Sequence, residues 1–315
     1  MKKLVIGVLI VALLLLTSLY IFIPNAVNIK SETVIHTSRS GLVRMLMDNN
    51  NWAKWWPGKS IVSQDSINPS LSYQGINYKV SSKNISQLQV LITGEGTILN
   101  SVLYFISLKA DSVKLVWETL LPTSYNPIKR FFAYQKAKQI TTDLNTLLKT
   151  MENYFSNTEN IYSSTIQQVL VNDTSLISTS GISKGYPSIA FIYSLIDKLK
   201  TYSLNQGAQQ TNSPMLNINT TDSIKFTVKV ALPVNKRLPG TNDIFYKWMM
   251  YGGKILVTEV KGDNNVTARA LLQMSRYVSD FQMVAPAIPF YSLVTDRRIE
   301  PDSSKWITKV YYPVM

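Results

Sequence analysis

The sequence predicts an α+β protein in which an N-terminal transmembrane helix is followed by two domains outside the membrane. Three observations carry this prediction: an apolar run at the start of the chain, a strand-rich stretch closed by one long helix, and a repeated segment near the end. The chain has 315 residues, enough for two domains of ordinary size that each bury an apolar core.

The apolar run extends from Leu4 to Ile23 and contains no charged residue. At about 1.5 Å rise per residue, a helix of this length spans a hydrocarbon core of roughly 30 Å. No small-residue cleavage site precedes Pro24, which favours an uncleaved signal anchor over residues 1–24 rather than a removed signal peptide. Because lysines precede the run, we expect a single-pass inner-membrane protein with a cytoplasmic N-terminus and periplasmic domains.

Residues 25–156 are predicted to form the first domain outside the membrane. A long closing helix is expected because Asn126-Pro127 is a helix-start signal and apolar residues then recur every three or four positions as far as Phe155. One strand, a helical excursion, a run of strands and one long closing helix is the order of a helix-grip fold. The expected strands are 28–37, 60–64, 76–82, 86–93, 96–107 and 112–118, and the expected helices are 38–48 and 126–155.

The second domain, residues 158–315, contains a duplication. Residues 222–234 read DSIKFTVKVALPV, and eighty positions later residues 302–314 read DSSKWITKVYYPV, with seven of the thirteen positions identical. The two copies, about 158–234 and 246–315, share the order strand, helix, strand, strand. This pattern predicts two equivalent units that pack around an approximate twofold axis.

The repeat makes a direct prediction about four residues. Val230 and Val310 should occupy equivalent strand positions, and Lys225 and Lys305 should lie on equivalent elements. The expected strands of this domain are 161–170, 175–181, 214–219, 223–232, 253–261, 289–295 and 304–313, and the expected helices are 187–204 and 266–280.

Three short motifs in the first domain carry a family resemblance. They are Asn51-Trp52-x-x-Trp55-Trp56-Pro57, Leu115-Val116-Trp117 at a strand end, and Asn126-Pro127-x-x-Arg130 at the start of the last helix. With these motifs the domain resembles the SRPBCC (START-like, polyketide cyclase-like) family. The resemblance implies a helix-grip cavity for hydrophobic molecules. The three tryptophans either line the mouth of that cavity or fill the core, and core packing is the commoner role at such a corner.

The second domain resembles the GyrI-like family of the AraC effector-binding type. The motifs are Tyr186-Pro187-Ser188, Pro214-Met215, Val230-Ala231-Leu232-Pro233-Val234, Gly252-Gly253-Lys254 and Trp306-x-x-Lys309-x-Tyr311-Tyr312-Pro313-Val314. The resemblance implies a groove between the two copies that accepts small hydrophobic or cationic molecules. It also implies a glutamate shortly after a Pro-Phe pair.

This chain departs from that pattern, because Tyr291 follows Pro289-Phe290. A phenol carries no charge near neutral pH, since its reference pKa is about 10. We therefore expect a neutral or weakly polar, hydrophobic or aromatic ligand rather than a strong cation. The predicted ligand-binding residues are Tyr291, Phe290, Trp248, Tyr311, Tyr312 and Trp306. Alternation along a strand allows at most one of the two adjacent tyrosines to enter a given groove.

Enzymatic chemistry is not expected. The chain has no cysteine and one histidine, His36, which lies in an expected strand without a recognisable nucleophile. No residues show metal-ligand spacing or a phosphate-binding loop, so no metal and no cofactor are predicted. A hydrolase, as among some GyrI-like relatives, remains an alternative, which the replacement of the family glutamate by Tyr291 disfavours.

The net charge of +13 comes from lysines scattered singly along the chain, which indicates a basic surface and no nucleic-acid partner. The leading functional prediction is therefore a membrane-anchored, extracytoplasmic protein that binds or senses a small molecule without catalysis. A lipid or hydrophobic-metabolite carrier that uses the START-like cavity is a further alternative. The sequence names no protein partner, and the predicted membrane contact is through residues 4–23.

Overall fold

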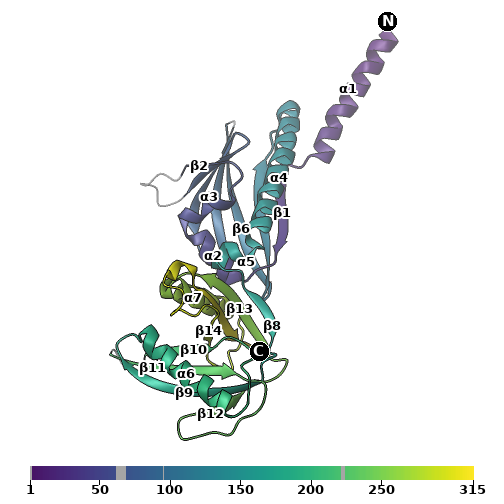
Figure 1. Cartoon of the computed structure of the whole chain (residues 1–315). Coiled ribbons are helices and arrows are strands. Elements are labelled where there is room, and N and C mark those ends of the chain that lie inside the picture. The colour runs from purple at the N-terminus through teal and green to yellow at the C-terminus, as the bar shows by residue number, and fades with distance from the viewer. Residues whose placement is uncertain (1, 62–68, 95, 221–223) are drawn as a thin grey trace. The chain divides into compact units, whose positions relative to one another are not determined.

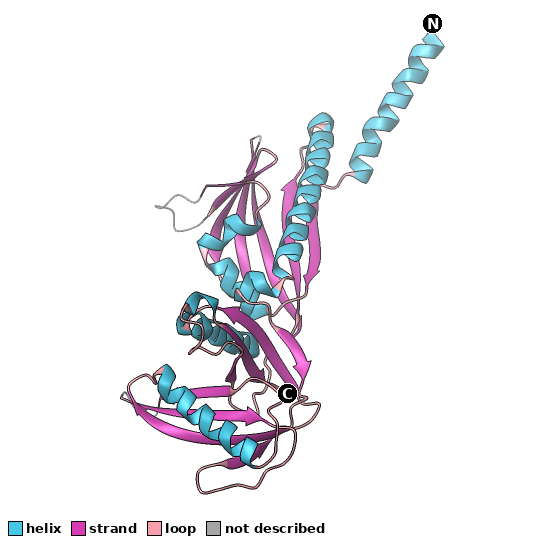
Figure 2. Ribbon diagram, viewed as in Figure 1, coloured by secondary structure: helices cyan, strands magenta, loops and turns pink. Residues whose placement is uncertain are grey.

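The computed structural model describes residues 2–61, 69–94, 96–220 and 224–315. The chain divides into two compact units, Met1–Asn157 (unit 1) and Thr158–Met315 (unit 2). Both consist of antiparallel strands with packed helices, an α+β arrangement (Figures 1 and 2).

The first helix, α1, spans Lys2–Phe22. Across the described part of the chain, no helix combines the length and the apolar character that crossing a membrane requires. The predicted anchor over residues 1–24 is therefore wrong, and so are the membrane contact through residues 4–23, the single-pass inner-membrane location and the periplasmic placement of the domains. The sequence argument rested on the length of the uncharged run, the absence of a cleavage site and the lysines before it.

The end of α1 is attached to unit 1 by polar contacts. The hydroxyl of Tyr20 donates to the carbonyl oxygen of Tyr125 over 2.6 Å, and the guanidinium carbon of Arg130 lies 4.9 Å from the centre of the Tyr20 ring. Arg130 is buried and donates through Nε to the carbonyl oxygen of Ile23 over 2.9 Å. The end of the apolar run, at Tyr20 and Ile23, thus contacts the folded unit at Tyr125 and Arg130.

Unit 1 is a seven-stranded antiparallel sheet in the order β1-β7-β6-β5-β4-β3-β2, and the long helix α4 packs along β1 and β7 (Figure 1). Pro127 begins α4, and the side chain of Asn126 accepts from the N–H groups of Ile128 and Lys129. The elements are β1 Ala26–Ile35, α2 Arg39–Met47, η1 Asn49–Asn51, α3 Trp52–Trp55, β2 Lys59–Ile61, β3 Ser70–Tyr73, β4 Ile76–Lys83, β5 Gln87–Gly94, β6 Thr97–Lys109, β7 Ser112–Pro122 and α4 Pro127–Phe155.

Two parts of unit 1 differ from the expected elements. The predicted strand 60–64 ends at Ile61 in β2, and positions 62–64 lie outside the described residues. Strand β3, Ser70–Tyr73, was not predicted, because it lacks a strong apolar alternation.

Unit 2 is an eight-stranded antiparallel sheet in the order β12-β9-β11-β10-β14-β15-β13-β8. Helices α6 and α7 cover one face, which we call the helix face, over two apolar cores. We call the other side the open face. The elements are α5 Thr158–Tyr162, β8 Gln167–Leu170, β9 Ser175–Lys184, α6 Ile189–Asn205, β10 Met215–Thr220, β11 Lys225–Pro233, β12 Phe245–Trp248, β13 Lys254–Lys261, α7 Asn264–Asp280, β14 Phe290–Leu293, η2 Ser303–Lys305 and β15 Ile307–Pro313.

The strand order of unit 2 is that of two copies related by an approximate twofold axis. Strands β9, β11 and β10 of the first copy correspond to β13, β15 and β14 of the second. Val230 and Val310 are both buried and each pairs with a residue on either neighbouring strand, so these two valines occupy equivalent positions as predicted. The partners are Leu216 and Thr179 for Val230, and Tyr291 and Thr258 for Val310.

The prediction for Lys225 and Lys305 is wrong. Lys225 is the first residue of β11, whereas Lys305 is the last residue of the one-turn helix η2. The side chain of Asp302 accepts from the N–H of Ser304 and starts that turn, so the strand begins only at Ile307. Residues 222 and 223 of the first copy lie outside the described residues. The duplication therefore rests on strand order, and not on all thirteen aligned positions.

Two further elements of unit 2 differ from expectation. The start of the predicted strand 161–170 lies in α5, because Tyr162 is buried and its hydroxyl donates to Asp280 Oδ2 over 2.9 Å. Strand β12, Phe245–Trp248, pairs with β9 and extends the sheet of the first copy, as β8 pairs with β13 and extends that of the second.

Candidate functional site

Strand β14 presents successive side chains to opposite faces of the sheet. Tyr291 lies on the helix face, where it packs against both the core under α6 and the core under α7. Phe290 lies on the open face, where its ring stacks on Tyr311 with centroids 5.1 Å apart and an interplanar angle of 18°. These predicted binding residues therefore do not share one groove.

The other predicted residues are also dispersed. Tyr312 packs against the core under α7, on the side opposite to Tyr311. Trp306 is buried, and its Nε1 donates to the carbonyl oxygen of Glu300 over 2.8 Å. Trp248 lies on the edge strand β12, is 70% exposed, and borders a separate cavity of about 580 Å³.

A pocket of about 190 Å³ lies over the pairing of β10 with β14, where the two copies meet on the helix face. Both copies supply its walls. They include Tyr186, Leu216 and Phe226 from the first copy, and Asn264, Tyr291 and Arg297 from the second. Of the six predicted residues, Tyr291 is the one that lines this pocket.

Arg297 is the buried charged group of the pocket, with 7% of its surface exposed. Its Nη1 donates to Asn264 Oδ1 over 2.7 Å, and its Nη2 donates to Thr308 Oγ1 over 3.1 Å. The guanidinium carbon lies 4.8 Å from the centre of the Trp306 ring, a cation–π contact. Its Nε is buried and has no hydrogen-bond partner among the described residues. Every group that contacts the guanidinium in these interactions is neutral.

Burial lowers the pKa of Arg297, and the nearby phenols of Tyr193, Tyr186 and Tyr291 act in the opposite direction. An arginine still keeps its charge near neutral pH inside a protein. Burial and the neighbouring Tyr186 raise the pKa of Tyr291, so this phenol is a neutral donor and acceptor. The pocket thus combines one positive charge with neutral hydroxyl groups and apolar walls.

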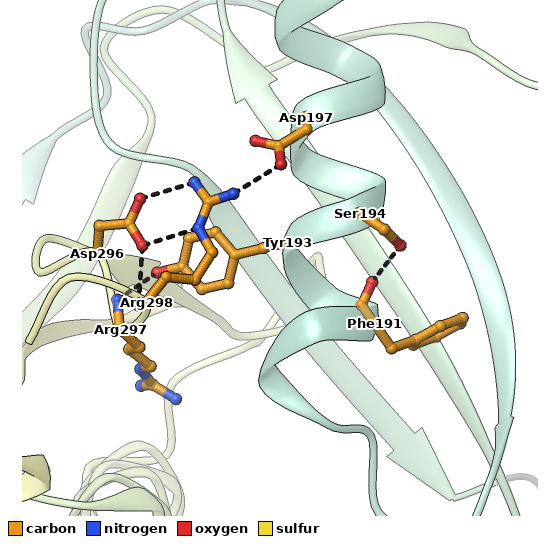
Figure 3. Close-up of polar contacts among 7 residues, drawn as sticks. All are labelled: Phe191, Tyr193, Ser194, Asp197, Asp296, Arg297 and Arg298. Carbon is orange, nitrogen blue, oxygen red and sulfur yellow. Dashed lines mark hydrogen bonds and ion pairs between the residues drawn. The ribbon is translucent and has the colours of Figure 1, made fainter. Parts of the chain in front are cut away.

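The neighbouring residue Arg298 has the opposite surroundings (Figure 3). Its Nη2 lies 2.8 Å from Asp296 Oδ2 and its Nη1 lies 2.7 Å from Asp197 Oδ2. Figure 3 also shows the side chain of Arg297 pointing away from this pair. The hydroxyl of Tyr193 accepts from the backbone N–H of Arg297 over 2.9 Å and holds this part of the chain against α6. The two arginines are therefore adjacent in sequence but differ in partners.

Sequence reasoning missed Arg297. The available signal was the pair Arg297-Arg298 after a strand, although Lys236-Arg237 is a second basic pair after a strand in the same unit. That signal does not distinguish which arginine is buried, because burial depends on Asn264 and Thr308, which lie on other elements.

The interior of unit 1 is packed with aromatic rings. Trp56 lies 5.4 Å from Trp55 and 5.4 Å from Tyr78, and Tyr78 lies 6.1 Å from Trp117, measured between ring centroids. All four side chains are buried, which is the core role of the tryptophans rather than the cavity-mouth role. Beneath them, Asp143 Oδ2 and the Tyr78 hydroxyl are buried without a hydrogen-bond partner, and burial raises the pKa of Asp143.

No family model and no curated protein sequence matches this chain. Among solved structures, the chain is similar to the C-terminal domain of EcmrR at 16% identity, covering 48% of this chain and 98% of that chain with a TM-score of 0.41. It is similar to a hydrolase from Listeria innocua at 10% identity, covering 48% and 92%, with a TM-score of 0.36. It is also similar to SAV2435, solved bound to tetraphenylphosphonium, at 13% identity, covering 48% and 94%, with a TM-score of 0.31.

Proposed function

We propose that unit 2 binds a small molecule in the helix-face pocket and that it does so without catalysis. The observation that carries this proposal is the pocket itself, which both copies build at their junction and which the buried Arg297 lines. Convergent polar groups among apolar walls are the usual composition of a ligand site. The GyrI-like resemblance of the sequence agrees with a binding role for this unit.

The size of the pocket limits the ligand. Its volume of about 190 Å³ is below the roughly 300–1,000 Å³ of pockets that hold drug-sized ligands. Leu216, Phe226 and Tyr291 offer apolar and aromatic surface. A molecule with one aromatic ring fits this volume and these walls.

A second candidate site lies on the open face. A cavity of about 460 Å³ there is bordered by Phe290, Met215 and Met249, together with Phe245. Flexible methionine side chains adapt to apolar ligands of different shapes. This observation favours a larger hydrophobic ligand and is the reason to test both faces.

The carrier and hydrolase alternatives have less support. A carrier that uses unit 1 needs space beneath the sheet, but aromatic side chains in mutual contact occupy the interior near Tyr78. A hydrolase needs a base next to the substrate, and the described residues that line the pocket include no histidine and no carboxylate.

The test uses two adjacent residues that lie on opposite faces. A library of one-ring compounds is screened against the full chain by ligand-detected NMR, and hits are remeasured with Tyr291→Ala and with Phe290→Ala. We expect hits whose binding is lost in Tyr291→Ala and kept in Phe290→Ala. Loss of binding only in Phe290→Ala would indicate that the site is on the open face. A library without hits, or hits indifferent to both changes, would refute the proposal.

A further inference from the structure

We propose that the ligand of the helix-face pocket carries an oxyanion, either a carboxylate or a phosphate monoester, and that Arg297 binds this group. The inference rests on the proposed function, because it specifies the ligand of the same pocket. An anionic ligand differs from the neutral ligand that the sequence predicted. That prediction was based on Tyr291 and did not include Arg297.

The first step of the argument is the charge of Arg297. A guanidinium remains protonated at neutral pH, so burial cannot neutralise it. A buried charge is costly unless an opposite charge or a full set of hydrogen bonds compensates it. Here the acceptors are an amide oxygen of Asn264 and a hydroxyl oxygen of Thr308, and Nε has no acceptor. Among the described residues, the guanidinium therefore lacks a counter-ion, and its Nε lacks an acceptor.

The second step concerns the carboxylates next in sequence to Arg297 and to its hydrogen-bond partner Asn264. Asp296 forms its ion pair with Arg298. Asp263 accepts from the backbone N–H groups of Asn265 and Val266 at the start of α7. Both aspartates thus interact with other groups. Within the described ranges Arg297 forms no salt bridge with an acid.

The third step concerns what a ligand meets in the pocket. An oxyanion matches the planar donor geometry of a guanidinium and can accept from two of its N–H groups. Burial raises the pKa of Tyr186 and of Tyr291, which keeps both phenols protonated and able to donate. Leu216 and Phe226 then face the ring of an aromatic acid. A cation would instead face the guanidinium across the same small space.

The experiment measures binding of four one-ring probes to the full chain by isothermal titration calorimetry. The probes are benzoate, phenyl phosphate, benzamide as the neutral counterpart of benzoate, and benzyltrimethylammonium as the cation. We expect benzoate or phenyl phosphate to bind at least about tenfold more tightly than benzamide, which corresponds to ~1.4 kcal/mol. Benzyltrimethylammonium should show no binding. The stronger of the two anions identifies the kind of oxyanion.

The matched variants are Arg297→Gln and Arg298→Gln, which lower the net charge by the same amount. Arg297→Gln should weaken binding of the preferred anion by about tenfold or more, because it removes the direct partner. Arg298→Gln should change the affinity by less than about twofold, because an exposed charge is screened by salt. Equal losses in both variants would mean that the overall positive field, and not Arg297, attracts the anion.

Failure of the inference and failure of the proposed function are distinguishable. If benzamide binds as tightly as benzoate, and Tyr291→Ala removes both, the pocket binds small molecules but the oxyanion assignment is wrong. If none of the probes binds and the NMR screen also gives no hit, the proposed function fails with it. Circular dichroism checks the fold of each variant. Should Arg297→Gln not fold, the comparison of benzoate with benzamide on the unaltered chain decides alone.

Discussion

Among the described residues, each unit of this protein buries an ionisable side chain without an opposite charge, and burial affects the two groups differently. In unit 1, Asp143 has a buried oxygen without a described partner, and burial raises its pKa, which favours the neutral form. In unit 2, Arg297 has an unpartnered buried nitrogen, and burial lowers its pKa without removing the charge near neutral pH. A carboxyl group can relieve its burial by taking up a proton, whereas a guanidinium depends on an anion from outside. A buried unpaired charge therefore indicates a ligand site most strongly when the group cannot neutralise itself.

The units also differ in how aromatic residues use space. Trp52, Trp55 and Trp56 fill the interior of unit 1 in direct ring contact. At the junction of the copies in unit 2, Tyr291 leaves a hollow beside Arg297. A high density of aromatic residues in the sequence therefore does not distinguish a packed core from a ligand site. The packing of the rings in the structure makes that distinction.

The largest expected effect is on the packed interior of unit 1. Trp117 is buried against Tyr78, and its Nε1 donates to Ser101 Oγ over 3.0 Å. Trp117→Ala should lower the free energy of unfolding of unit 1 by about 3–5 kcal/mol in urea titrations. The control is Trp248→Ala, whose side chain is 70% exposed and should change stability by less than ~0.5 kcal/mol. Similar losses in both would show that unit 1 is not tightly packed.

The next effect concerns the charge balance of the pocket. Tyr291→Glu places a carboxylate beside Arg297 and supplies an internal counter-ion, so benzoate affinity should fall about tenfold, or ~1.4 kcal/mol. The control Tyr291→Gln introduces a side chain of the same size as glutamate without its charge, so it should reduce benzoate affinity much less. Calorimetric titration of both variants provides the measurement. Equal affinities for the two would contradict the role of charge at this position.

A smaller effect is expected at Asp143. Its folded-state pKa lies above its unfolded value, so the folded protein binds more protons and loses stability as pH rises between the two values. Asp143→Asn should therefore raise the free energy of unfolding at pH 7 by on the order of 1 kcal/mol. The gain should vanish below about pH 4, where the acid is protonated in both states. Asp111→Asn, at an exposed turn, serves as the control, and a gain independent of pH would refute the explanation.

The smallest effect is expected on the open face. Tyr311→Leu removes the stacked pair with Phe290 and should cost roughly 0.5–1 kcal/mol of stability in unit 2. Benzoate affinity should be unchanged, because Tyr311 lies across the sheet from the helix-face pocket. A drop in benzoate affinity would mean that the two faces are not independent.

Features set by local chemistry were predictable from the sequence. The long helix α4 followed from its Asn126 cap and its apolar spacing, and the copy order of unit 2 followed from the repeat around Val230 and Val310. Features set by distant contacts were not predictable. The burial of Arg297 depends on Asn264 and Thr308, and the place of α5 depends on Tyr162 reaching Asp280.

The predicted site was partly dispersed for a similar reason. The prediction grouped Phe290 and Tyr291 through the family motif after Pro289, but a strand sends neighbouring side chains to opposite faces. The predicted membrane anchor is wrong because no helix in the described part of the chain is long and apolar enough to cross a membrane.

The pairing of Leu216 with Tyr291 has an evolutionary consequence. These residues occupy the same place in the two copies and meet each other across the approximate twofold axis. An ancestral pair of identical copies would have presented the same side chain twice to one pocket. After duplication, each gene half could mutate this position alone, so ligand preference could change by a single substitution while the other half preserved the strand pairing.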